Sequence, residues 1–191
     1  MKNLTFSLYS LENTVFTTKD ISLILRENNL DKLKSRINYY VKKGTLVQLR
    51  RGIYAKSSGY EILEASNKIF TPSYISLETV LQREGVVFQD YGNTIFVISY
   101  QTRELRLKEY TISFKKFKNE TLMNPEGIIT EKGYSIASKE RAFLDCLYLY
   151  KNYYFDNLDP IDWGKAEGLL PVYQNKALNN RFKDYAKDYK S

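Results

Sequence analysis

The sequence predicts an α+β fold in two parts, a helical domain over residues 1–58 and a mixed domain over residues 59–191. Three observations lead to this prediction. In the first part a helical pattern of apolar residues is followed by a short hairpin pattern. In the second part the spacing changes to a run of β-rich segments, typical of a small antiparallel sheet with packed helices. Between them lies a polar stretch that ends in glycine, Lys56-Ser57-Ser58-Gly59.

The first domain is expected to begin with two short helices. Leucines at spacings of three and four indicate a helix over residues 4–11. Thr17 is expected to cap the second helix, with the Asp20 side chain reaching back to it in a capping box. This helix should end near Asn28-Asn29, where the chain turns into the next helix.

The stretch Leu30–Ala55 predicts a third helix followed by a hairpin. Asp31 is expected to cap the helix, because its carboxylate can accept from unpaired N–H groups of the first turn. Gly44 stands where a helix usually ends through a left-handed residue. Two strands follow, Thr45–Leu49 and Ile53–Ala55, joined by a tight turn at Arg50-Arg51-Gly52. The inward face of the helix consists of Leu33, Ile37, Tyr40 and Val41.

The opposite face of this helix is polar and cationic. With two arginines in the hairpin turn, the outline is that of a winged helix-turn-helix. In that motif a helix enters the major groove, and the hairpin reaches a neighbouring phosphate or the minor groove. The residues expected to contact double-stranded DNA are Lys32, Lys34, Ser35, Arg36, Asn38, Tyr39, Lys42, Arg50 and Arg51.

The distribution of charge favours the same interpretation. Residues 1–58 contain 11 Lys/Arg and 4 Asp/Glu, so they account for the whole net charge of +7. Between Lys32 and Tyr60 stand eight basic residues and no acidic one. Such a patch attracts a polyanion, although a basic face can also be merely solvated. The missing acids and the helix–hairpin outline favour DNA over the solvated face.

The second domain is expected to start with a short helix that turns Ile62, Ala65 and Ile69 inward and stops at Thr71-Pro72-Ser73. Ser73 is then expected to cap a helix from Tyr74 to Arg83, ended by Gly85. Ser138 should cap a further helix that is apolar on almost every side, which is typical of a buried helix. The expected strands are 94–99, 103–110, 111–117, 127–130 and 134–136, and amphipathic helices are expected between Tyr173 and Tyr189.

Composition argues against several classes of protein. The absence of histidine removes the commonest general base and most zinc ligand sets. Cys146 is the single cysteine and is flanked by apolar residues, which favours an inert core thiol. Asp90 could be arranged with Glu131-Lys132, or with Glu104, as a metal-nuclease carboxylate set, but carboxylates at arbitrary spacing occur in any chain of this size. We therefore expect no enzyme activity, no cofactor and no metal site.

We expect no signal for secretion and no membrane-spanning segment in this sequence. The N-terminus has no long apolar run with a small-residue cleavage site, and no stretch of about 18 apolar residues could span a bilayer. A cytoplasmic protein is the simplest expectation.

Three segments together resemble one protein family. They are Leu49–Ala55, Ser73–Leu81 and Ile136–Asp145, and in this order they resemble the AbiEi-type antitoxins of bacterial abortive-infection toxin–antitoxin pairs. The resemblance implies an N-terminal winged helix that represses its own operon. It also implies a C-terminal domain that counteracts a nucleotidyltransferase toxin encoded beside it. Lys139 and Arg141 stand where the family usually has proline and lysine.

The third segment supplies the candidate residues of the antitoxin domain, Lys139, Arg141 and Asp145. Asp145 needs a partner or a place at the surface, because an isolated buried carboxylate is costly. It can pair with Arg141 one turn earlier, or contact a partner protein. Two other functions stay open at the level of sequence: a winged-helix regulator whose second domain binds a ligand or dimerises, and a nuclease.

Overall fold

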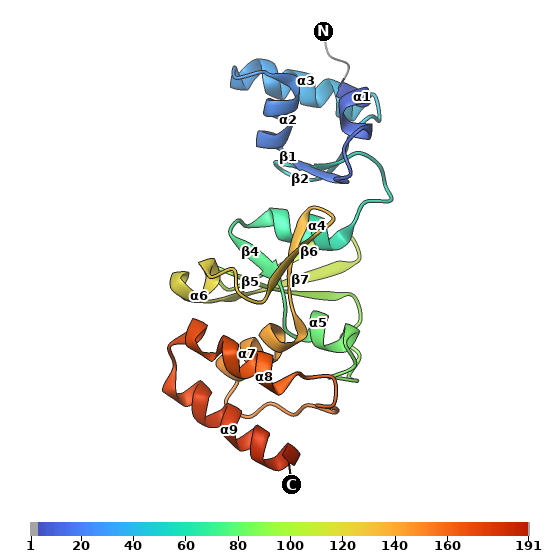
Figure 1. Cartoon of the computed structure of the whole chain (residues 1–191). Coiled ribbons are helices and arrows are strands. Elements are labelled where there is room, and N and C mark those ends of the chain that lie inside the picture. The colour runs from blue at the N-terminus through green and yellow to red at the C-terminus, as the bar shows by residue number, and fades with distance from the viewer. Residues whose placement is uncertain (1–3, 191) are drawn as a thin grey trace. The chain divides into compact units, whose positions relative to one another are not determined.

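The computed structural model describes residues 4–190, and their side chains as far as residue 187. It divides into two compact units, shown in Figure 1. The N-terminal unit comprises the chain up to Thr71 together with Lys132–Tyr134. The C-terminal unit comprises Pro72–Glu131 and the chain from Ser135 onward. Both contain helices and strands, which confirms the α+β class.

The described part of the N-terminal unit contains four helices and a small antiparallel sheet (Figure 1). The sheet has the order β1-β3-β2. Strand β1 was not expected from the sequence. The elements in chain order are α1 (Leu4–Tyr9), β1 (Val15–Thr17), α2 (Thr18–Leu25), α3 (Leu30–Lys42), β2 (Val47–Arg50), β3 (Ile53–Ala55) and α4 (Ile62–Ile69).

The starts and ends of these helices follow local chemistry. The capping box of Thr17 and Asp20 is present at the start of α2. Helix α2 ends at Leu25, earlier than expected, because Arg26 adopts a left-handed conformation with φ 51°. The prediction that Asp31 caps α3 is wrong. Asn29 caps α3 instead, since its side-chain oxygen accepts from the backbone N–H groups of Asp31 and Lys32 at 3.1 and 3.0 Å.

A hydrophobic core holds α1, α2 and α3 against the sheet. Leu33 and Ile37 supply the inward face of α3, each 2% exposed, as the periodicity predicted. Tyr40 and Val41 are partly buried beside them. Because this face is fixed, the opposite face of α3 is turned outward. The buried residues of the core are Leu4, Leu8, Phe16, Ile21, Leu25, Leu33, Ile37, Leu46 and Tyr54.

Helix α4 belongs to the N-terminal unit, so the division falls later than the expected boundary at residues 58/59. The reason is the fully buried carboxylate of Glu64 on α4. It accepts hydrogen bonds from the Asn13 amide at 2.9 Å, from the N–H and hydroxyl of Thr14 at 2.8 and 2.7 Å, and from the Val15 N–H at 3.1 Å. Lys68 donates to it at 2.9 Å. Glu64 therefore fastens α4 to the start of β1.

We expect Glu64→Ala to lower the free energy of unfolding of the N-terminal unit by about 3 kcal/mol, because buried donors lose their acceptor. Unfolding in urea can be followed by circular dichroism. The fluorescence of Trp163 serves as the internal control, because Trp163 lies in the C-terminal unit. Glu12→Ala removes an exposed acid from the same unit and should change little. Equal stabilities of the two variants would contradict this role of Glu64.

The C-terminal unit is built on a six-stranded sheet of order β6-β7-β5-β4-β9-β8. The expectation of an antiparallel sheet is wrong in part, because β4 with β9 and β5 with β7 are parallel pairs. The elements are β4 (Ser73–Ile75), α5 (Glu78–Arg83), β5 (Thr94–Ser99), β6 (Arg103–Leu107), β7 (Tyr110–Lys116), α6 (Asn119–Met123), β8 (Ile128–Glu131), β9 (Tyr134–Ala137), α7 (Lys139–Leu149), α8 (Trp163–Leu169), the 3₁₀ helix η1 (Leu170–Tyr173) and α9 (Lys176–Lys190).

The prediction of a helix from Tyr74 to Arg83 is also wrong over its first half. Ser73–Ile75 forms β4 in the middle of the sheet, where Tyr74 pairs with Ile98 of β5. The chain then passes through Leu77 at a φ of 56°, and α5 begins only at Glu78. Gly85 ends this segment at a φ of 71°, as the sequence predicted.

Helix α7 is the central helix of this unit. Ser138 caps it, since its side-chain oxygen accepts from the Arg141 N–H at 3.2 Å. Every residue from Glu140 to Leu147 is buried. Helices α5, α8 and α9 pack against α7, and Figure 1 shows α7, α8 and α9 gathered on one side of the sheet. Within the described residues, no helix has the length and apolar character needed to cross a membrane.

Candidate nucleic-acid interface

The outward face of α3 carries most of the residues expected to contact DNA. Leu33 and Ile37 point into the core, so most residues on the opposite face of the helix are turned to solvent. Asn29 fixes the first turn and Gly44, at a φ of 75°, lies just beyond the last. The exposed side chains are Lys32, Lys34, Ser35, Asn38, Tyr39 and Lys42.

The cations of this face make few contacts that would compete with a phosphate. Lys34 lies 3.5 Å from Asp31, but their side chains are 68% and 94% exposed, so the pair is weak. Tyr39 is 57% exposed and packs edge-on against Tyr40, with ring centroids 5.4 Å apart. The Lys43 ammonium lies 5.8 Å from the centroid of the Tyr39 ring. Lys43 is exposed and was missing from the predicted set, although it directly follows Lys42 in the sequence.

Arg36 differs from the other residues of the predicted set. It is half-buried, and its guanidinium lies 3.8 Å from the carboxylate of Glu27, in the turn between α2 and α3. Glu27 also accepts from the Asn29 N–H at 3.1 Å. Arg36 therefore helps to hold α3 in its orientation, and it presents less of its charge to solvent than the lysines do.

The hairpin turn is anchored to the start of α2. The Thr18 N–H donates to the carbonyl of Gly52 at 3.0 Å, and the Thr18 hydroxyl approaches the same oxygen at 3.4 Å. Gly52 adopts a φ of 85°, which favours glycine at this position of the turn. Arg51 is exposed and Arg50 is half-buried. Because the turn is fixed to the same core as α3, the two basic elements form part of one rigid unit.

The second predicted set lies in the interior of the C-terminal unit. Arg141 and Asp145 form an ion pair one turn apart on α7, at 3.3 Å, and both side chains are fully buried. Asp145 accepts from the hydroxyls of Ser76, Tyr173 and Tyr74 at 2.6, 2.6 and 3.3 Å. Of the two alternatives for Asp145, the structure shows the pair with Arg141. Lys139 lies apart from this pair, half-buried at the start of the helix.

The guanidinium of Arg141 joins α7 to α6 and to the turn before β8. It donates to the carbonyls of Glu126 and Thr121 at 2.9 and 2.8 Å and lies over the rings of Tyr173 and Tyr74. Burial raises the pKa of the Asp145 carboxyl, and the charge of Arg141 and the three hydroxyl donors oppose that shift. The sequence showed the spacing of Arg141 and Asp145, but not the tyrosines that arrive from β4 and η1.

The other chemically reactive candidates lie in separate places. Cys146 is buried, and burial raises the pKa of its thiol, as expected for an inert core residue. Among the residues that the structure describes, no three Asp, Glu or Cys side chains form a group able to hold a metal ion. Asp90, Glu104 and Glu131 therefore do not form such a group. A comparison with protein-family models finds no match, and a comparison with curated proteins finds no similar sequence.

Proposed function

We propose that the N-terminal unit is a winged helix-turn-helix that binds double-stranded operator DNA. The observation that supports this most directly is the outward face of α3, where exposed lysines, Ser35 and Asn38 stand on a helix held by its buried opposite face. An α-helix of this kind fits the major groove. Arg50 at the end of β2 and Arg51 in the β2–β3 turn can reach the phosphates beside it.

We further propose that the protein is an antitoxin of the AbiEi type. It represses its own operon through the N-terminal unit and counteracts a nucleotidyltransferase toxin through the C-terminal unit, without being an enzyme itself. Three segments that resemble that family support this proposal. They form the β2–β3 hairpin, the stretch from β4 into α5, and the β9–α7 junction. The last contains Arg141 and Asp145, which stabilise the C-terminal unit.

The DNA-binding proposal is tested with the full chain and a fluorescent duplex from upstream of its own gene. We expect tight binding to this duplex and weaker binding to a shuffled duplex of the same length and composition. Equal affinity for the two duplexes would contradict operator recognition. The antitoxin proposal is tested separately, by expressing the chain from an unrelated promoter together with the neighbouring gene. Growth should be rescued if the neighbour is a nucleotidyltransferase toxin, and no rescue would overturn this part.

We expect Ser35→Ala and Asn38→Ala to relax the sequence preference. Both side chains are exposed on α3 and are short enough to contact base edges without a charge. Each should cost about 1–3 kcal/mol on the preferred duplex, and much less on a shuffled one. Affinities for a set of single-base variants of the duplex measure this. A uniform loss on all duplexes would instead place these side chains against the phosphates.

A further inference from the structure

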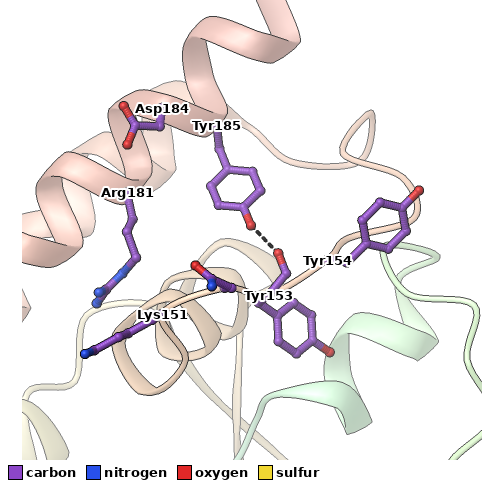
Figure 2. A pocket seen from close by; sticks show the side chains of 7 residues that line it. Lys151, Tyr153, Tyr154, Arg181, Asp184 and Tyr185 are labelled. Carbon is purple, nitrogen blue, oxygen red and sulfur yellow. Dashed lines mark hydrogen bonds between the residues drawn. The ribbon is translucent and has the colours of Figure 1, made fainter.

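A pocket of about 510 Å³ opens in the C-terminal unit, outside the proposed DNA interface. It lies between α9 and the segment that follows α7, as Figure 2 shows. Two of its residues are cations, Lys151 and Arg181, and both side chains extend toward the same side of the pocket in Figure 2. The other residues that line it are Asn152, Tyr153, Tyr154, Asp184 and Tyr185.

The Arg181 side chain lacks the partners that a half-buried arginine usually has. Its Nε atom is buried, and no group in the described part of the chain accepts a hydrogen bond from it. In the same part of the chain, no carboxylate lies within ion-pair distance of Arg181 or Lys151. Because two positive charges in one pocket repel each other, an anion between them would be stabilised.

The walls of the pocket are held by aromatic packing. The Tyr185 hydroxyl donates to the backbone carbonyl of Tyr153, the hydrogen bond drawn in Figure 2. The Tyr185 ring packs edge-on against Phe155 at 5.5 Å, and the Tyr153 ring stacks on Tyr150 at the same centroid separation. Tyr154 is different, since 80% of its side chain is exposed. The pocket thus combines a fixed wall with one aromatic ring open to a ligand.

These features suit one class of ligand. A guanidinium with a neighbouring ammonium binds phosphate oxygens, and an exposed tyrosine ring can stack on a base. Asp184, which also lines the pocket, can accept from the hydroxyl or amino groups of a nucleoside. We propose that this pocket binds a nucleotide through its phosphate, either free or at the 5′ end of a single-stranded RNA. The proposal concerns a site separate from the N-terminal unit and does not rest on the proposed function.

The test uses isothermal titration calorimetry on the full chain. One arm titrates ATP, GTP, CTP and UTP separately, and the other titrates a 5′-phosphorylated RNA hexamer beside its unphosphorylated form. Inorganic triphosphate, which has phosphates but no base, shows what the aromatic ring contributes. The variants are Arg181→Gln, Lys151→Gln and Tyr154→Leu. Lys183→Gln is the matched control, because it removes an exposed cation from the same helix outside the pocket.

We expect Arg181→Gln and Lys151→Gln each to weaken binding about tenfold, and Lys183→Gln to change it less than about twofold. Binding of free nucleotides alone, or of the phosphorylated hexamer alone, would identify the source of the phosphate. The proposal is overturned if none of these ligands binds at millimolar concentration, or if Lys183→Gln weakens binding as much as Arg181→Gln.

Discussion

Asp145→Ala is expected to destabilise the C-terminal unit by about 3–5 kcal/mol, the typical cost of leaving one member of a buried ion pair alone. Arg141 is fully buried and would keep its charge without the carboxylate that faces it. The hydroxyls of Ser76 and Tyr173 would lose their acceptor at the same time. Losses of this size approach the whole stability of a small domain.

The measurement is equilibrium unfolding in urea, followed by the fluorescence of Trp163. This is the one tryptophan of the chain, and it packs on Phe143 and Phe182 in the C-terminal unit. Asp145→Asn is the matched variant, because it keeps the size and one acceptor and should cost less. The Asp145→Ala protein should still bind its duplex but fail to rescue growth. A loss below about 1 kcal/mol would show that the pair contributes little.

The double variant Arg50→Ala with Arg51→Ala is expected to weaken DNA binding by one to two orders of magnitude, about 1–3 kcal/mol. The loss should be similar on the preferred and the shuffled duplex, because the hairpin turn is proposed to contact phosphates. The protein should derepress its operon in a reporter strain and still protect cells when supplied from another promoter. This is the opposite of the phenotype expected for Asp145→Ala.

Fluorescence anisotropy at fixed salt measures these affinities. The matched control is Lys176→Ala with Lys183→Ala, which removes the same two charges from exposed positions on α9. If this control weakens binding as much as the hairpin variant, net charge and not the hairpin determines affinity. A changed sequence preference in the hairpin variant would mean that the hairpin reads bases.

The sequence was most informative where structure depends on residues three or four positions apart. Thr17 with Asp20, Ser138 and Gly44 were assigned correctly, because caps and helix ends depend on immediate neighbours. Ser73 shows the limit of this approach. It has the chemistry of a helix cap, yet β5 and β9 on either side draw Ser73–Ile75 into the sheet. The parallel pairs could not be predicted either. The partners in β4 and β9, Ile75 and Ile136, lie far apart in the chain, and β5 pairs with β7 rather than with β6, the strand that follows it.

The candidate DNA-binding face was partly accessible from the sequence. Helical periodicity separated inward from outward residues of α3 because one face packs on a core. It could not show that Arg36 pairs with Glu27, since that contact depends on the turn between two helices. Nor could it show that Glu64 fastens α4 to β1, across about 50 residues of chain. In the C-terminal unit, the pocket of Lys151 and Arg181 joins two segments that share no sequence motif.

The salt dependence of DNA binding tests the central claim most directly. If the face of α3 and the β2–β3 turn neutralise about five phosphates, the logarithm of the binding constant should fall with the logarithm of salt concentration at a slope of about −4 to −5. The Arg50→Ala, Arg51→Ala variant should reduce this slope by about two. A binding constant that does not change with salt would contradict DNA recognition by this face.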